Sequence, residues 1–161
     1  MFEVFGEFDS AEEINKAAAG QLAQGDTQAI RDIARENGLD SADAEDYIAG
    51  DVTELCNPLM AALGKIKVEE DELKPVEIVQ DWVNYIKAQA TEHSDMAIEV
   101  RKKGKTVKGC IAELLKWSYK NCYVVDKDIV KAAGIGVTVK MGIPGIGHAY
   151  EIIKAYYLGG K

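Results

Sequence analysis

The chain has 161 residues, of which 47% are hydrophobic and 29% are charged, and its formal net charge is −8. A domain of this length buries roughly two thirds of its surface on folding, so its stability requires neither a metal nor a disulfide. The composition excludes a disordered chain, no window approaches the ~18 apolar residues of a membrane span, and the N-terminal segment lacks the basic region of a secretory leader. We therefore expect a cytoplasmic protein that folds on its own.

The sequence carries no motif for catalysis or metal binding. Cys56, Cys110 and Cys122 are odd in number and form no C-x-x-C pair, which excludes a disulfide framework and a zinc site, so we expect small core residues. His93 and His148 are the only histidines and lie in no metal or triad pattern. The phosphate-binding loop, the nucleophile elbow and the zinc-protease motif are all absent. We expect a protein that is not an enzyme and uses no cofactor and no metal.

Charge is distributed unevenly along the chain. Residues 1–80 contain 19 acidic and 6 basic residues, whereas residues 81–161 contain 8 acidic and 13 basic residues. Two interpretations remain open. Either the two halves attract each other and their remaining charges face solvent, or each half carries a single-sign field that selects a charged partner.

Helix signals begin near the N-terminus. Ser10 and Glu13 have the spacing of a capping box and predict a helix that ends at Gly25. Asp26 is then expected to cap a second helix, and Gly38 provides a left-handed stop for it. Both helices carry apolar residues at helical spacing, so we expect each to bury one face.

Two further helices are expected before the middle of the chain. Residues 41–48 form a short helix, and Asp51 with Glu54 repeats the capping-box spacing. That second cap predicts a helix through Leu55 that holds Pro58 within its first turns or bends there.

The middle of the chain predicts three helices. Pro75 is expected at the first position of one, since proline is tolerated there. Its buried stripe follows at spacings of three and four residues, through Val76, Val79, Val83, Ile86 and Ala90. A shorter helix carries Met96 to Val100. Thr106 then caps a helix whose inner side holds Val107, Cys110, Ile111, Leu114, Leu115 and Ser118.

The last segment predicts helices over 127–133 and 148–158, joined by a glycine-broken stretch, 134–147, with room for a short strand. The tryptophans, Trp82 and Trp117, and the tyrosines that follow are expected in the core or at its rim. The fold class is therefore all-α, with about seven to nine helices and at most one short β element near the C-terminus. We expect one domain over 1–161, with an acidic helical half (1–68) and a basic half (69–161).

Residues 33–48, IARENGLDSADAEDYI, have the spacing of a helix-turn-helix. The spacing is set by Ala34, Gly38, Leu39, Ala44 and Tyr47. The second helix and its lead-in carry four carboxylates and no basic residue, although contacts with phosphates require Lys or Arg. We therefore predict a helical hairpin used for packing. If the hairpin has a binding role, its acidic row suits imitation of a nucleic-acid backbone.

The nonapeptide 101–109, RKKGKTVKG, is a cationic loop in an acidic protein. Cations at its start suit the negative end of the preceding helix, but Lys105 and Lys108 lie at the start of the next one, where the dipole disfavours them. Either a bound anion or an acidic neighbour in the same protein would relieve these two lysines.

The segment 81–121, DWVNYIKAQATEHSDMAIEVRKKGKTVKGCIAELLKWSYKN, resembles the PcfK-like proteins, small proteins encoded on conjugative plasmids and related mobile elements. Their pattern is a helix, a lysine-rich turn and then K-[ST]-h-x-G-C-h, which opens a second helix. In this chain the pattern corresponds to Lys105, Thr106, Val107, Gly109, Cys110 and Ile111. The match covers about 40 to 50 residues.

The resemblance implies a biological setting and no catalytic residues. Some relatives of this type are anti-CRISPR proteins, which inhibit the RNA-guided nuclease of type II systems, a Cas9-type nuclease. The resemblance thus implies a binding protein of a mobile genetic element that acts on the nucleic-acid machinery of the host. The acidic half agrees with this implication, because acidic inhibitors can occupy positively charged nucleic-acid channels.

Two surfaces are candidate binding sites. In the inhibitor hypothesis, acidic residues occupy a basic groove of a protein partner sterically and electrostatically, through Asp40, Asp43, Glu45, Asp46, Asp51 and Glu54. The alternative is a conjugation accessory protein that binds DNA or RNA through the basic residues Arg101, Lys102, Lys103, Lys105 and Lys108. A homo-oligomeric structural subunit is a third interpretation, and no membrane contact is expected.

Overall fold

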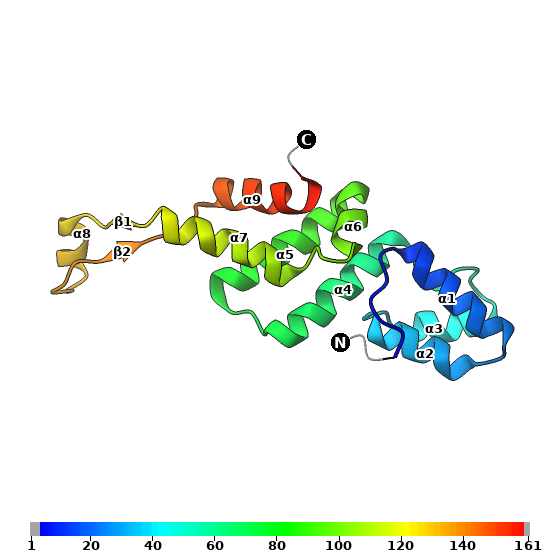
Figure 1. Ribbon diagram of the computed structural model, residues 1–161. Helices are drawn as coiled ribbons and strands as arrows, with labels where there is room; N and C mark the ends of the chain where they lie inside the picture. Colours follow the sequence, from blue (N-terminus) through cyan, green and yellow to red (C-terminus); the bar gives the residue numbers. More distant parts are fainter. Residues whose placement is uncertain (1–3, 160–161) are drawn as a thin grey trace.

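The structure is a computed structural model that describes residues 4–159 (Figure 1). Residues 1–3 and 160–161, the ends of the predicted 1–161 domain, lie outside the described residues. The described part contains nine helices and one two-stranded antiparallel sheet near the C-terminus, which confirms the all-α prediction. None of its helices combines the length and apolar character needed to cross a membrane.

The N-terminal end of the molecule is built from α1 (Ala11–Ala23), α2 (Thr27–Glu36) and α3 (Ser41–Ala49). Each helix starts at a side chain that accepts a backbone N–H, and these caps are Ser10, Asp26 and Asp40. The first two caps confirm the sequence prediction, because capping depends on residues that are neighbours in the chain.

The long helix α4 (Pro58–Leu73) begins later than predicted. Its cap is Asn57, whose Oδ1 accepts the N–H of Met60 at 2.9 Å, so the prediction that Asp51 and Glu54 form a capping box was wrong. Proline fits the first turn of a helix but not its interior. Pro58 therefore sets the start of α4, and residues 51–57 form a loop.

Two helices follow in the body, α5 (Glu77–Glu92) and α6 (Ser94–Arg101). The start of α5 was predicted two residues early. The chain is still extended at Val76 (φ −132, ψ 157), and that side chain is 70% exposed instead of joining the buried stripe. The remaining positions of the stripe are buried or partly buried, as predicted.

The body is completed by α7 (Val107–Lys120) and α9 (Ile146–Leu158), which pack against each other. Thr106 caps α7 as predicted, since its Oγ1 accepts the N–H of Gly109 at 2.9 Å. Leu115, predicted on the inner side, is 66% exposed, because the buried face of α7 is narrower than the apolar pattern suggested.

A narrow extension, which we call the arm (residues 121–143), projects from the body beyond α7 (Figure 1). It contains β1 (Tyr123–Val124), α8 (Lys127–Ala132) and β2 (Lys140–Met141). The two strands are antiparallel, with Tyr123 opposite Met141 and Val124 opposite Lys140. The arm contains the short strand that the glycine-broken segment allowed.

The buried apolar residues form two clusters. One joins α1, α2 and α3 with the loop before α4, and the other joins α4, α5, α6, α7 and α9. Helix α4 contributes Ala61 to the first cluster and Ile66 to the second, so the predicted 68/69 boundary between the halves falls inside this helix. Cys56 and Cys110 are buried as expected, but Cys122, at the base of the arm, is exposed.

Candidate functional site

The helix-turn-helix positions are used for packing. Ala34, Leu39, Ala44 and Tyr47 are all buried in the N-terminal cluster. Gly38 turns the chain at φ +67 and touches α4, because a Cβ at this position would lie 2.3 Å from the carbonyl oxygen of Gly64. The turn between α2 and α3 is thereby fixed against α4, as expected of a packing hairpin.

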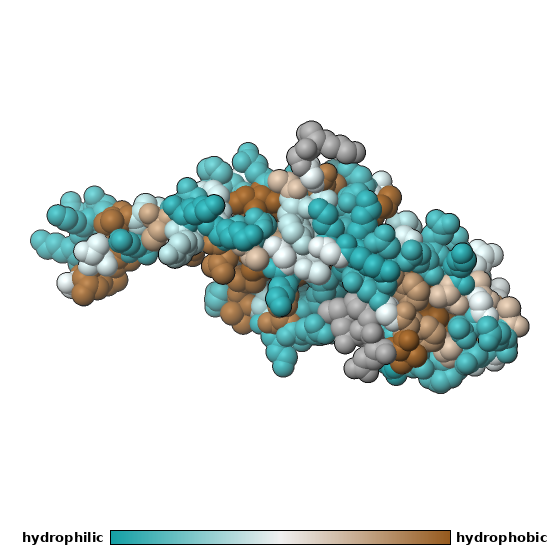
Figure 2. Space-filling model, in the orientation of Figure 1, coloured by the Kyte–Doolittle hydropathy of each residue, from teal (hydrophilic) through white to brown (hydrophobic). Residues whose placement is uncertain are grey.

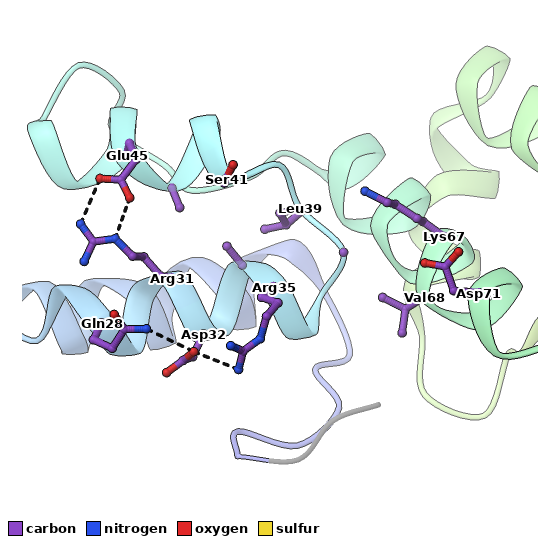
Figure 3. Close-up of a pocket in the computed structure, with 13 residues that line it drawn as sticks. Gln28, Arg31, Asp32, Arg35, Leu39, Ser41, Glu45, Lys67, Val68 and Asp71 are labelled. Atoms are coloured by element: carbon purple, nitrogen blue, oxygen red, sulfur yellow. Dashed lines mark hydrogen bonds and ion pairs between the residues drawn. The ribbon is translucent and has the colours of Figure 1, made fainter.

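The predicted acidic residues do not form one row. Asp40 is a cap, with its Oδ1 accepting the N–H of Ala42 at 3.1 Å. Glu45 forms a two-pronged ion pair with Arg31, at 2.6 Å from Nε and 3.0 Å from Nη2 (Figure 3). The hydrogen bond from Arg31 lowers the pKa of Glu45. These two residues are therefore occupied by contacts within the N-terminal helices.

Glu45 lies in a groove of about 390 Å³ between the α2–α3 pair and α4 (Figure 3). The groove is lined by as many acidic as basic side chains, and two of its pairs neutralise each other: Arg31 with Glu45, and Arg35 with Asp32 at 2.9 Å. Lys67 on the α4 wall faces this region together with Asp71. The formal charges that line this groove therefore cancel.

Three other predicted carboxylates converge elsewhere. Asp43, Asp46 and Glu54 line a hollow of about 260 Å³ formed by α3, the 51–57 loop and the start of α4. Apolar side chains, including Val52 and Met60, line the same hollow. Within residues 4–159, none of the three carboxylates makes a hydrogen bond or an ion pair. We call these three residues and their hollow the acidic depression, and Asp51 is exposed in the adjoining loop.

The acidic depression offers no reactive thiol. Cys56 lines it, but burial raises the pKa of this thiol to about 11; Arg101 opposes that rise and the nearby Glu54 and Asp43 add to it. The thiol is therefore protonated and unreactive at neutral pH. In the part of the chain that the structure describes, no three His, Cys, Asp or Glu side chains are arranged to hold a metal ion.

In the cationic loop, two of the five predicted contacts with nucleic acid are used by the fold. Arg101 is only 1% exposed, and its Nη2 donates to Oδ1 of Asn37 at 2.7 Å, so its prediction as a surface contact was wrong. Burial lowers the pKa of this guanidinium, and nearby carboxylates, with Glu7 the foremost, oppose that shift. The buried Arg101 ties α6 to the turn after α2.

Lys105 is satisfied by the last turn of α9. Its Nζ donates to the backbone carbonyl of Tyr156 at 2.5 Å and lies 5.2 Å from the centre of the Tyr156 ring. A cation is favourable at the C-terminal end of a helix, where the dipole is negative. An internal partner therefore relieves this lysine, and no bound anion is needed.

The remaining lysines of the loop differ in exposure. Lys102 pairs with Glu99 at 2.6 Å, whereas Lys103 and Lys108 are exposed and their side chains make no hydrogen bond or ion pair with residues 4–159. No ion pair joins the side chains of the loop to α3 or to the 51–57 loop in the described chain. The loop thus retains two free cations out of five.

The loop meets the acidic half at the N-terminal segment. Asp9 accepts the backbone N–H of Lys103 at 2.7 Å. Lys65 of α4, which is 1% exposed, donates to the carbonyl of Lys102 at 2.6 Å and pairs with Glu7 at 2.9 Å. The two halves do attract each other here, while the acidic depression takes no part in these contacts.

Sequence reasoning missed this polar junction between the two apolar clusters. Glu69, one turn after Lys65 in α4, is buried and accepts the N–H of Val107 at the start of α7. Asn37 is completely buried at the same junction. The available signal was Lys65 and Glu69, a Lys and a Glu four residues apart in the helix that also carries Ile66.

Comparisons of this chain with protein-family models, with curated proteins and with solved structures find no match. The segment that resembles the PcfK-like pattern corresponds to α5, α6 and α7. Its motif has a packing role in this fold: Thr106 caps α7, Cys110 is buried, and a Cβ on Gly109 would lie 2.3 Å from the hydroxyl of Tyr156.

Proposed function

We propose that the chain is a noncatalytic binding protein whose acidic depression engages a basic surface of a protein partner. A lysine or arginine can lay its apolar stem along Val52 and Met60 and place its charged head between the carboxylates. The three carboxylates are available for this because no described residue neutralises them.

The contrast between the two charged surfaces carries this proposal. The acidic depression keeps Asp43, Asp46 and Glu54 open, whereas the cationic loop commits Arg101 and Lys105 to internal contacts. Nucleic-acid affinity grows with the number of phosphates that free cations neutralise. Two free lysines make the loop a weaker binding surface than its sequence suggests.

In its sharpest version, we propose a cytoplasmic protein of a mobile genetic element that inhibits a Cas9-type nuclease. The supporting observations are the PcfK-like segment and the open carboxylates. Such nucleases hold the guide–target duplex in a positively charged channel. Carboxylates that occupied this channel would compete with phosphates and exclude the nucleic acid sterically.

The test is to measure binding to a Cas9-type nuclease and inhibition of its DNA cleavage. The pair of changes Asp46→Lys and Glu54→Lys should weaken binding about tenfold or more, because close charge pairs carry coupling energies of that size. The matched control, Asp81→Lys with Glu151→Lys, reverses two exposed carboxylates away from the depression and should leave binding unchanged. Absence of binding, or an equal loss in both double variants, would contradict the proposal.

Nucleic-acid binding tests the alternative function. A conjugation accessory protein should bind DNA or RNA with an affinity that falls steeply with salt, and Lys103→Glu with Lys108→Glu should abolish that binding. We expect the wild-type protein to show no such affinity at physiological ionic strength. A tight, salt-dependent complex that these two changes remove would favour the alternative.

A further inference from the structure

The arm and its base carry much of the apolar surface of this molecule. Eleven of the seventeen large apolar side chains that are exposed among the described residues lie between Leu115 and Tyr150. Figure 2 shows hydrophobic surface on the arm and on the adjoining part of the body. Single exposed apolar residues are ordinary, but a concentration of this kind marks an interaction surface.

The arm has no core of its own to explain these residues. Each of its strands has two residues and α8 has six. None of residues 115–143, all of which the structure describes, is buried. An isolated two-stranded ribbon and a helix of fewer than two turns are both marginal in water. The arm therefore does not bury these apolar side chains within itself.

The arm also contains a defined hollow. A cavity of about 480 Å³ lies between β1, α8 and the 134–138 turn. Its apolar lining consists of Val124, Val125, Val130, Ile135 and Val137. This volume is within the range of ligand-binding cavities, so the hollow is large enough for a ligand the size of several side chains.

The charged side chains that line this cavity are of one sign. Lys127 and Lys131, one helical turn apart on α8, line it, and neither makes an ion pair with a residue in 4–159. Neither carboxylate of the arm, Asp126 or Asp128, lines the cavity, and Asp126 caps α8 by accepting the N–H of Asp128 at 2.8 Å. The rim is therefore cationic and the lining aliphatic.

We infer that this cavity docks a segment of a partner protein that combines aliphatic and acidic side chains. Aliphatic side chains of the segment fill the valine and isoleucine lining, and its carboxylates pair with Lys127 and Lys131. A nucleic acid would satisfy the lysines but has no aliphatic groups for the lining. The inference goes beyond the proposed function, since this surface has the opposite charge to the acidic depression and lies on the other half of the chain.

The test begins with a selection from a random peptide library displayed on phage, using the immobilised full-length protein. The expected result is enrichment of peptides rich in aliphatic and acidic residues. Val137→Asp should abolish this enrichment, and Lys127→Glu with Lys131→Glu should change the enriched charge from acidic to basic. The strongest peptide is then synthesised and titrated by fluorescence anisotropy. The two lysine reversals should weaken its binding about tenfold or more.

Two controls separate docking from loss of structure. Lys16→Glu with Lys154→Glu reverses two exposed lysines outside the arm and should leave the affinity for the synthetic peptide unchanged. Val137 is 71% exposed, so Val137→Asp should unfold at the temperature of the wild type. The inference is overturned if enriched peptides bind this variant equally well, if no acidic and aliphatic peptides are enriched, or if oligonucleotides displace them. A dimer in light scattering that Val137→Asp disrupts, without peptide enrichment, would instead identify a second copy as the occupant and would equally overturn it.

Discussion

In the cationic loop, Arg101 is buried and Lys105 donates to a helix carbonyl, whereas in the acidic depression Asp43, Asp46 and Glu54 stay open among the described residues. The two regions are both dense in charge along the sequence. Side-chain length separates them, because arginine and lysine reach across to acceptors on other elements while their stems stay buried. Asp43 and Asp46 on α3 have shorter side chains and accept no hydrogen bond from another element of the described chain. Charge density along the sequence therefore does not by itself show which charged side chains are open.

The largest expected effect comes from removing an internal cation that contacts the loop. Lys65→Met leaves Glu69 buried without its nearest cation. It should lower the free energy of unfolding by about 3 kcal/mol, since breaking a buried ion pair is strongly destabilising. Lys67→Met, two residues further along α4 and exposed, should change stability by less than about 0.5 kcal/mol. Urea denaturation measures the free energy of unfolding of both variants. Equal effects would mean that buried and exposed cations are equivalent in this fold.

The next effect concerns the close contact that holds the α2–α3 turn against α4. A Cβ on Gly64 would lie 2.2 Å from the carbonyl oxygen of Asn37, so Gly64→Ala should cost about 2 kcal/mol through overpacking. Gly20 in α1 has open space around its Cβ position, and Gly20→Ala should instead stabilise the protein by about 0.5 kcal/mol. Thermal and urea unfolding of both variants will show whether the signs differ. A tolerated Gly64→Ala would exclude the close approach.

A smaller effect separates the structural and free lysines of the loop. Lys105→Gln removes the charged hydrogen bond to Tyr156 and should cost about 1 kcal/mol. Lys108→Gln removes an exposed lysine with no partner in the described chain. Its free energy of unfolding should be within about 0.5 kcal/mol of that of the wild type. The comparison is made by urea denaturation at low salt. If Lys108→Gln proved the more destabilising change, the assignment of the two lysines would be reversed.

The smallest expected effects are the pH dependences of two neighbours on α4. Burial raises the pKa of Glu69, so its contribution to stability is present below the unfolded pKa near 4.5 and is lost as pH rises through the folded value. Burial also opposes ionisation of Glu70, but hydrogen bonds from Lys87 and Gln80 outweigh it and lower the pKa of Glu70. With rising pH, Glu69→Gln should therefore gain stability relative to the wild type.

Glu70→Gln should change in the opposite direction, because the wild type gains stability when Glu70 ionises. Urea denaturation from acidic to neutral pH gives the free energy of unfolding of each variant relative to the wild type. Plotted against pH, these two differences should diverge as pH rises. Parallel curves for these adjacent residues would contradict the different environments of their carboxylates.

The sequence predicted local structure well where neighbouring residues determine it. The caps at Ser10, Asp26 and Thr106 were correct because each depends on a hydrogen bond three residues along the chain. The starts of α4 and α5 were misplaced. For α4, the spacing of Asp51 and Glu54 imitates a cap, but Pro58 determines where the helix can begin.

The candidate site was less predictable, since exposure depends on contacts between distant segments. Glu45 and Asp46 are adjacent in sequence, yet Arg31 occupies one and the other lines the acidic depression. Arg101 meets Asn37, a residue 64 positions earlier, which no local pattern indicates. The helix and the short strand of the arm were expected, but β1 was not, because a strand of two residues is too short to show alternation.

The most direct test of the central claim is an NMR titration of the isotope-labelled full-length protein at physiological ionic strength. Two probes are compared, an arginine-rich peptide and a short single-stranded DNA, and backbone amide shifts are followed. The open acidic depression predicts that the peptide shifts amides within residues 40–57 and that the DNA leaves residues 101–108 unchanged. DNA-induced shifts in 101–108, with no peptide-induced shifts in 40–57, would contradict it.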